Sequence, residues 1–260
     1  MSKAQEILTK FMNQLGQVVE KTASTLSKGR SVKAGKPKKT GITDEEGQDF
    51  ATIHWDERHI HALLSAAERT QLFTLIPSLQ GKTTLHLTPS ATDYLFMMNK
   101  RGAENVVEVD VTKSSVATEV PQERDHPYLR GALDKLPLKN QLFDFILYPS
   151  ALAWRADLPA LIPEMVRVLK DNGRFLLSTV HPFFEYLMNP RGGFRKNIGN
   201  LFSQFKKNGF FVDELREATL EETLRVVSLP PKLIEELRRF QGMPIVLLMR
   251  GILLRKRSKK

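Results

Sequence analysis

The sequence predicts an α/β fold with a doubly wound, mostly parallel sheet that carries helices on both faces. Short apolar runs such as residues 83–88 alternate with longer segments of helical periodicity, and the connections between them are mostly short. Parallel strands need a crossover, usually a helix, so this alternation is typical of a parallel sheet. With 260 residues, 41% of them hydrophobic, the chain has enough apolar material for one sizeable domain and extensions.

An amphipathic helix is predicted for the N-terminal segment, residues 1–27. Over residues 3–26, apolar side chains from Ile7 to Val19 recur at spacings of three and four. The following segment, 28–49, is rich in Lys, Gly and Ser and has no apolar period, so we expect a flexible basic linker. The helix therefore needs a surface for its apolar face, either on this chain, on a partner protein or at a membrane interface.

The main domain is predicted to span residues 50–254, followed by a basic tail at 255–260. It opens with a helix that carries Leu63, Leu64 and Leu72 on one face. Helical and extended periodicities then predict, in chain order, helix 56–76, strand 83–88, helix 91–101, strand 105–110, strand 143–148, helix 157–170, strand 174–180, helix 196–207, strand 210–216, helix 231–240 and strand 243–254.

The net charge of +10 is concentrated at the two ends of the chain. Residues 1–40 carry nine Lys or Arg and two Glu, residues 250–260 carry six basic residues and no acid, and the stretch between is slightly acidic. This distribution argues against a basic groove across the domain. It favours basic arms that contact an acidic partner, RNA or an anionic membrane surface, or that only keep the chain soluble.

Composition excludes some kinds of site and bounds the compartment. The chain has no cysteine, which rules out disulfides and thiol chemistry. No apolar run reaches the roughly 20 residues of a membrane span, so we expect a soluble protein in the cytoplasm or another reducing compartment. His54, His59 and His61 do not share one helix face, and no metal site is predicted.

Three segments resemble the small-molecule branch of the class I S-adenosylmethionine-dependent methyltransferases, type 11-like. They are LPLKNQLFDFIL at 136–147, SALAW at 150–154 and LIPEMVRVLKDNGRFLLST at 161–179. From the residues themselves, Phe143 and 145–147 form a buried strand, Asp144 can cap or pair at its edge, and Gly173 lets the chain turn from helix to strand. The resemblance implies a Rossmann-like seven-stranded sheet with an antiparallel last strand, and S-adenosylmethionine as cofactor if the protein is active.

The cofactor loop departs from that family. Where the family has an acid and three glycines after its first strand, this chain has His86, then Thr88, Ser90 and Thr92. Glycine allows positive φ and close approach of a ligand, and another residue in a left-handed conformation costs roughly 1–2 kcal/mol. Pro89 also removes a backbone donor. The loop is therefore expected to follow another path, with Ser90 or Thr92 as N-cap of the next helix.

Two further contact positions are implied by the resemblance. Asp110 matches the acid at the end of the second strand, which in the family bonds the ribose hydroxyls, although an Asp that ends a strand is also a common cap. The acid that reads the adenine amino group falls on Ala132, and Asp134 could replace it only if the loop shifts.

His181 follows the predicted strand 174–180, at the carboxyl edge where open α/β sheets place their ligands. It is the candidate general base if the protein is active. The alternative is a structural histidine that packs under the side chains of Phe183 and Phe184.

Two functions follow from these residues. The first is a methyltransferase-fold protein that has lost S-adenosylmethionine binding and serves as a non-catalytic interaction or assembly module, with a protein partner on the N-terminal helix. The second is an active S-adenosylmethionine-dependent methyltransferase that acts on a small molecule and has a diverged cofactor loop.

Overall fold

The computed structural model describes residues 50, 53, 56–88, 94–111, 126–153, 157–189 and 197–255. The chain divides into two compact units, residues 1–60 and 61–260. The predicted N-terminal helix and the linker at 28–49 lie outside the described residues. The first unit contributes the start of helix α2, where the backbone N–H of Arg58 donates to the Asp56 carboxylate. The description below concerns the second unit.

The second unit is built on a seven-stranded sheet in the order β3-β2-β1-β4-β5-β7-β6. Neighbours from β3 to β5 pair in parallel, whereas β7 is antiparallel to both β5 and β6. This arrangement confirms the predicted doubly wound, Rossmann-like sheet with an antiparallel last strand. The strands are β1 Thr83–Thr88, β2 Asn105–Asp110, β3 Tyr128–Arg130, β4 Phe143–Ser150, β5 Leu169–Val180, β6 Phe210–Thr219 and β7 Pro244–Leu253.

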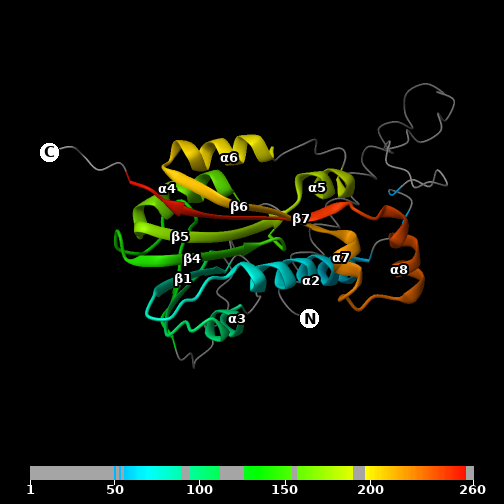
Figure 1. Cartoon of the computed structure of the whole chain (residues 1–260), viewed down its shortest axis with the longest axis horizontal. Helices are drawn as coiled ribbons and strands as arrows, with labels where there is room; N and C mark the ends of the chain where they lie inside the picture. Colours follow the sequence, from blue (N-terminus) through cyan, green and yellow to red (C-terminus); the bar gives the residue numbers. More distant parts are fainter. Residues whose placement is uncertain are drawn as a thin grey trace, which may run out of the picture. The chain divides into compact units, whose positions relative to one another are not determined.

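Helices cover both faces of the sheet. In Figure 1, α4 and α6 lie along one face, whereas α3 and the part of α2 from His61 onward lie along the other. The short helices α5, α7 and α8 gather near one end of the strands. The helices are α2 Glu57–Leu75, α3 Leu95–Lys100, α4 Leu158–Val168, α5 Pro182–Met188, α6 Ile198–Lys207, α7 Leu220–Leu224 and α8 Pro231–Leu237, followed by the 3-10 helix η3 Arg238–Phe240.

The sheet buries aromatic side chains against α4 and α6. The Phe175 ring stacks on Phe205 at a centroid distance of 4.7 Å, and Phe210 meets Phe175 edge-on at 5.1 Å. Burying a phenylalanine side chain contributes about 1.5–3 kcal/mol. Gly251 allows this packing, because a Cβ there would come within 2.8 Å of the Phe175 ring.

The helix after β1 begins later than predicted. We expected a helix over 91–101 with Ser90 or Thr92 as N-cap, but α3 begins at Leu95 and its N-cap position is Tyr94, which makes no side-chain cap. Residues 89–93, including Ser90 and Thr92, lie outside the described residues. The prediction was wrong about the start because cap chemistry near a loop favours several positions equally.

The junction between α4 and β5 differs from the prediction as well. Helix 157–170 was expected to turn at Gly173 into a strand, yet α4 ends at Val168 and β5 already starts at Leu169. The left-handed residue of this stretch is Asn172, with φ of 62°. Gly173 is needed for space: a Cβ there would lie 2.9 Å from the Leu169 side chain and from the Lys170 carbonyl. Register with β4 shifts between Phe143 and Phe145.

Three elements escaped sequence reasoning. Strand β3 has only three residues and no alternation, α5 and α7 are five to seven residues long, and helical or extended periodicity cannot be read over such lengths. The expected edge pairing of Asp144 is confirmed: its Oδ2 accepts from Lys170 Nζ at 2.8 Å and from the Thr83 N–H at 3.0 Å.

The stretch EMVR at 164–167, within the family-like motif, binds residues 136–138 of the segment that precedes β4. Arg167 binds the Glu164 carboxylate through Nε at 2.7 Å and Nη2 at 2.6 Å, and it donates to the carbonyls of Leu136 and Leu138. Glu164 also accepts the Leu136 N–H at 2.7 Å. The guanidinium of Arg167 holds the pKa of Glu164 below its usual value. The motif thus fastens residues 136–138 to α4.

Candidate cofactor site

The carboxyl ends of β1, β2, β4 and β5 meet at one edge of the sheet, since these strands are parallel to one another. Open α/β sheets place their ligands at this edge. Figure 1 places α5 and α7 at the same end. The site residues predicted from the sequence are therefore located relative to this edge.

His86 lies inside β1 and is sealed from solvent. It pairs in register with Glu108 of β2 and Leu147 of β4, and its exposed fraction is 1%. Its ring meets the Tyr94 ring edge-on, with centroids 6.2 Å apart. A buried imidazole within β1 thus occupies the position of the family's acid. It carries none of the negative charge with which a carboxylate would hold a cationic or polar group.

Thr88 closes β1, and its polar atoms are used within the sheet. The hydroxyl donates to the Val109 carbonyl at 3.2 Å, and the Thr88 carbonyl accepts the Val111 N–H at 3.1 Å. This threonine is therefore part of the β1–β2 ladder. Ser90 and Thr92, the other two positions that replace glycines, lie beyond the part of the chain that is described.

Asp110 is at the end of β2, where the resemblance predicts it. Its Oδ2 accepts the Tyr128 hydroxyl at 2.8 Å, and Arg130 Nε lies 3.9 Å away. The side chain keeps 17% exposure. Because β3 brings Tyr128 and Arg130 alongside, a ribose hydroxyl would have to share or displace these partners.

Ala132 lies in the connection between β3 and β4. It is exposed and forms an isolated antiparallel bridge with Lys135, whose N–H donates to the Ala132 carbonyl at 3.1 Å. Asp134 is exposed in the same turn. Gly131 packs tightly, since a Cβ there would be 2.6 Å from Pro137 Cδ. The turn is therefore held against residue 137.

Both ring nitrogens of His181 have partners. Nδ1 accepts the Phe183 N–H at 3.1 Å and so caps α5, and Nε2 lies 3.0 Å from Glu217 Oε1. The ring thus takes the tautomer with the proton on Nε2. Burial lowers the pKa of His181, while the Glu217 carboxylate partly offsets this. These contacts are those expected of a structural histidine, the alternative to a general base. The backbone N–H of Phe183 at the start of α5, and not the phenylalanine side chains alone, provides one of the partners.

Sequence reasoning missed a buried polar cluster centred on Glu68 of α2. Its carboxylate accepts the hydroxyls of Tyr94 and Ser178 and, at 2.8 Å, the N–H of Ala151. Ser178 in turn joins Ser150, whose hydroxyl donates to the Ser178 carbonyl at 2.5 Å. The signal was present: Glu68 falls four residues after Leu64 and four before Leu72, on the buried face of the helix.

Burial raises the pKa of Glu68, and its three donors oppose this effect. Burial and the neighbouring Glu68 also raise the pKa of Tyr94. The cluster joins α2, the start of α3, β5 and the residue after β4. It therefore fixes the segment that follows the altered loop against the carboxyl edge of the sheet.

These residues do not fit S-adenosylmethionine in the way the resemblance implied. In β1, the buried imidazole of His86 replaces the family's acid. Asp110 already contacts Tyr128 and Arg130. After β3, the position of the family's second acid is occupied by Ala132, whose methyl group cannot form a hydrogen bond. Buried or engaged partners weaken the recognition of a polar ligand.

Residues 88–177 match the family model described as methyltransferase domain. They contain β1's last residue, β2 to β4, α4 and most of β5, so the match follows the parallel half of the sheet. This segment is similar to a methyltransferase domain. The sheet order and the antiparallel last strand are those expected from the resemblance.

Two relatives are similar to parts of the chain. It is 31% identical over 123 residues to the biotin biosynthesis bifunctional protein BioHC of Cellvibrio japonicus (strain Ueda107), covering 46% of this chain and 24% of that protein. It is 27% identical over 89 residues to malonyl-[acyl-carrier protein] O-methyltransferase of Serratia marcescens, covering 34% and 35%. The chain thus spans about a quarter to a third of the length of these relatives.

The fold of the chain is similar to that of the S-adenosylmethionine-dependent methyltransferase of Mesorhizobium loti. The TM-score is 0.55 at 22% identity, over 73% of this chain and 99% of that one. Among the residues that the structure describes, there is no helix of the length and hydropathy that a membrane crossing requires, and no group of three His, Asp or Glu arranged for a metal ion.

Proposed function

We propose that this methyltransferase-fold protein has lost S-adenosylmethionine binding and acts as a non-catalytic interaction or assembly module. One observation carries the proposal: the position of the family's β1 acid is His86, buried to 1% exposure beside Tyr94. A neutral imidazole accepts at one nitrogen only and an imidazolium at none, whereas a carboxylate accepts at two oxygens and carries a negative charge.

The expected decrease in affinity for S-adenosylmethionine supports a loss of binding and not only weaker binding. A hydrogen bond to a charged group is worth about 1.5–3 kcal/mol, so removing two such contacts lowers affinity by a factor of about a hundred to ten thousand. The two contacts concerned are those of His86 and Ala132. The third, Asp110, has Tyr128 and Arg130 as competing partners.

The attachment points of the module are proposed at the chain's ends. The predicted amphipathic helix at 1–27 would take a protein partner, and the basic arms would take an acidic partner, RNA or an anionic membrane surface. Two of the C-terminal basic residues are held on the domain: Arg250 pairs with Asp213 at 3.1 Å and Arg255 with Asp171 at 2.6 Å. The tail's proposed contribution therefore rests on the basic residues from Lys256 onward.

The alternative function, an active S-adenosylmethionine-dependent methyltransferase for a small molecule, is favoured by one observation. Asp110 stands at the end of β2 with 17% of its side chain exposed, as ribose recognition would need. In that case Asp110→Asn would weaken cofactor binding, whereas under the proposed function it would change no cofactor affinity, because there is none to lose.

A restoration experiment tests the proposal. The variant His86→Asp, Thr88→Gly, Ser90→Gly and Thr92→Gly returns the family's acid and glycines, and Leu87→Val serves as a volume-reducing control in the same strand. Equilibrium dialysis against radiolabelled S-adenosylmethionine should show no uptake by the parent chain or the control. Uptake by the restored variant would show that these four positions removed binding; uptake by the parent chain would refute the proposal.

A further inference from the structure

The strands β6 and β7 are joined by far more chain than their pairing requires. They are antiparallel neighbours, and antiparallel strands can be linked by a turn of about two to five residues. Here residues 220–243 intervene and form α7, α8 and η3. The segment buries the side chains of Leu220, Leu237 and Phe240, and the Leu220 N–H donates to the Met243 carbonyl at 2.8 Å. The connection is thus an ordered structure of its own.

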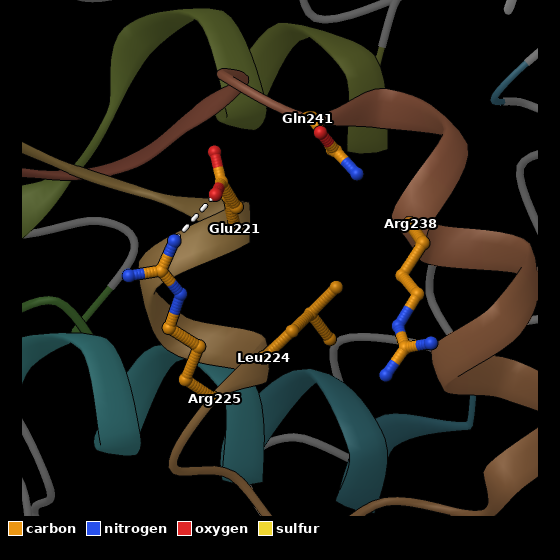
Figure 2. A pocket seen from close by; sticks show the side chains of 5 residues that line it. All are labelled: Glu221, Leu224, Arg225, Arg238 and Gln241. Carbon is orange, nitrogen blue, oxygen red and sulfur yellow. Dashed lines mark hydrogen bonds and ion pairs between the residues drawn. The ribbon is translucent and has the colours of Figure 1, made fainter.

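A hollow of about 240 Å³ opens between its helices. Glu221 and Leu224 of α7, Arg225 at its end, Arg238 of η3 and Gln241 line it. Figure 2 shows the two arginines on either side of Leu224, with the Gln241 amide above. Drug-sized ligands occupy pockets of about 300–1,000 Å³, so this hollow suits a smaller molecule.

The two guanidinium groups differ in their partners. Arg225 Nη2 is 2.5 Å from Glu221 Oε1, an exposed pair one helical turn apart. The Arg238 backbone N–H donates to the Ile234 carbonyl, but its guanidinium has no hydrogen bond or ion pair to any residue within the described part of the chain. With two arginines and one glutamate, the lining carries a net charge of +1. It is therefore complementary to a ligand with one negative charge.

We propose that this pocket binds a small carboxylate with a short apolar part. The planar fork of Arg238 matches a carboxylate, the Gln241 amide offers a further donor, and Leu224 provides an apolar surface for the ligand's carbon atoms. A phosphate dianion has about twice the charge of the lining and suits the pocket less well. None of these residues is a cofactor-contact position, so the inference goes beyond the proposed function and does not depend on it.

The test uses the full chain, labelled with nitrogen-15, and NMR titrations with butyrate, acetate and inorganic phosphate. The expected result is saturable shifts of the Arg238 Nε–H and the Gln241 side-chain amide, with butyrate binding more tightly than acetate and phosphate. Arg238→Gln should weaken butyrate binding about tenfold or more. Lys232→Gln removes the same charge from α8 outside the pocket and should leave the affinity unchanged.

A gain of affinity separates recognition from a folding defect. Glu221→Gln releases Arg225 and raises the charge of the lining, so it should tighten butyrate binding severalfold. The proposal is overturned if butyrate gives no saturable shifts, if phosphate binds more tightly than butyrate, or if Arg238→Gln and Lys232→Gln weaken binding equally. Absence of tightening in Glu221→Gln would also count against it.

Discussion

The carboxylate of Glu68, in the middle of α2, accepts a hydrogen bond from the hydroxyl of Tyr94, the residue that directly precedes α3. Both side chains are sealed from solvent, at 1% exposure each. This contact ties the chain just after the altered loop to a helix that precedes the sheet. The stability of the carboxyl edge should therefore depend on it.

Tyr94→Phe is expected to lower the free energy of unfolding by about 1–3 kcal/mol, because it removes a donor from a buried carboxylate oxygen. Urea denaturation followed by circular dichroism measures the change. A double-mutant cycle with Glu68→Gln should give a coupling free energy of about 0.5–3 kcal/mol. Additive effects of the two substitutions would show that the contact contributes nothing specific.

Glu68 should also make stability depend on pH. Burial raises the pKa of Glu68 above its ordinary value of 4.5. Between 4.5 and that raised value, the folded chain holds a proton that the unfolded chain has released, so stability falls as pH rises. Glu68→Gln cannot titrate and keeps an acceptor and a donor in place. The parent chain should lose stability relative to Glu68→Gln as the pH of urea titrations increases above 4.5; a constant difference would contradict the account.

His181 is expected to titrate below the ordinary histidine pKa of 6.5, since burial lowers its pKa. The unfolded chain then binds the proton first, so this residue's contribution to stability is lost as pH falls through 6.5 toward the folded value. Glu217→Gln should lower the pKa of His181 further, because Glu217 raises it. Imidazole NMR signals report both values. A pKa at or above 6.5 in the parent chain would show that the ring is not held as described.

Arg167→Lys is expected to destabilise the domain by about 1–3 kcal/mol, because a single ammonium nitrogen cannot replace the three guanidinium nitrogens that bind the Glu164 carboxylate and two carbonyls. Arg225→Lys is the matched control: its pair with Glu221 is exposed, and the change should be within about 0.5 kcal/mol. Thermal unfolding compares the two. Equal effects would mean that the motif does not fasten residues 136–138.

The same network predicts acid sensitivity. The pKa of Glu164 lies below its ordinary 4.5, chiefly through its hydrogen bonds to Arg167. Its stabilisation is therefore complete above pH 4.5 and is lost as pH falls toward the folded pKa. Glu164→Gln should be less stable than the parent chain at pH 7, and the difference in stability should narrow as pH falls below 4.5. A difference that stays constant over that range would argue against the pair.

The fold could be predicted from the sequence because its signals are local. Strand 143–148 and the segment 161–179 show their burial in nearby residues; the first falls within β4, and the second spans most of α4 and β5. The Glu68 cluster could not be predicted in the same way, since Tyr94 is 26 residues from Glu68 and Ser178 is 110 residues away. A carboxylate on an apolar helix face indicates that partners exist and does not say which residues they are.

The cofactor positions fall between these cases. The sequence alone placed Asp110 and Thr88 correctly at the ends of β2 and β1, because strand ends follow from the apolar pattern. It could not show that Tyr128 and Arg130 would lie beside Asp110, since β3 has only three residues and gives no periodic signal. The roles assigned to His86, Ser90, Thr92, Ala132 and His181 stay predictions.

Isothermal titration of the unmodified full chain with S-adenosylmethionine tests the central claim most directly. Loss of the contacts at His86 and Ala132 predicts no measurable heat of binding at ligand concentrations up to about 1 mM, the upper end of ordinary substrate affinities. A saturable isotherm with a micromolar dissociation constant would contradict the account and favour an active methyltransferase with a diverged loop.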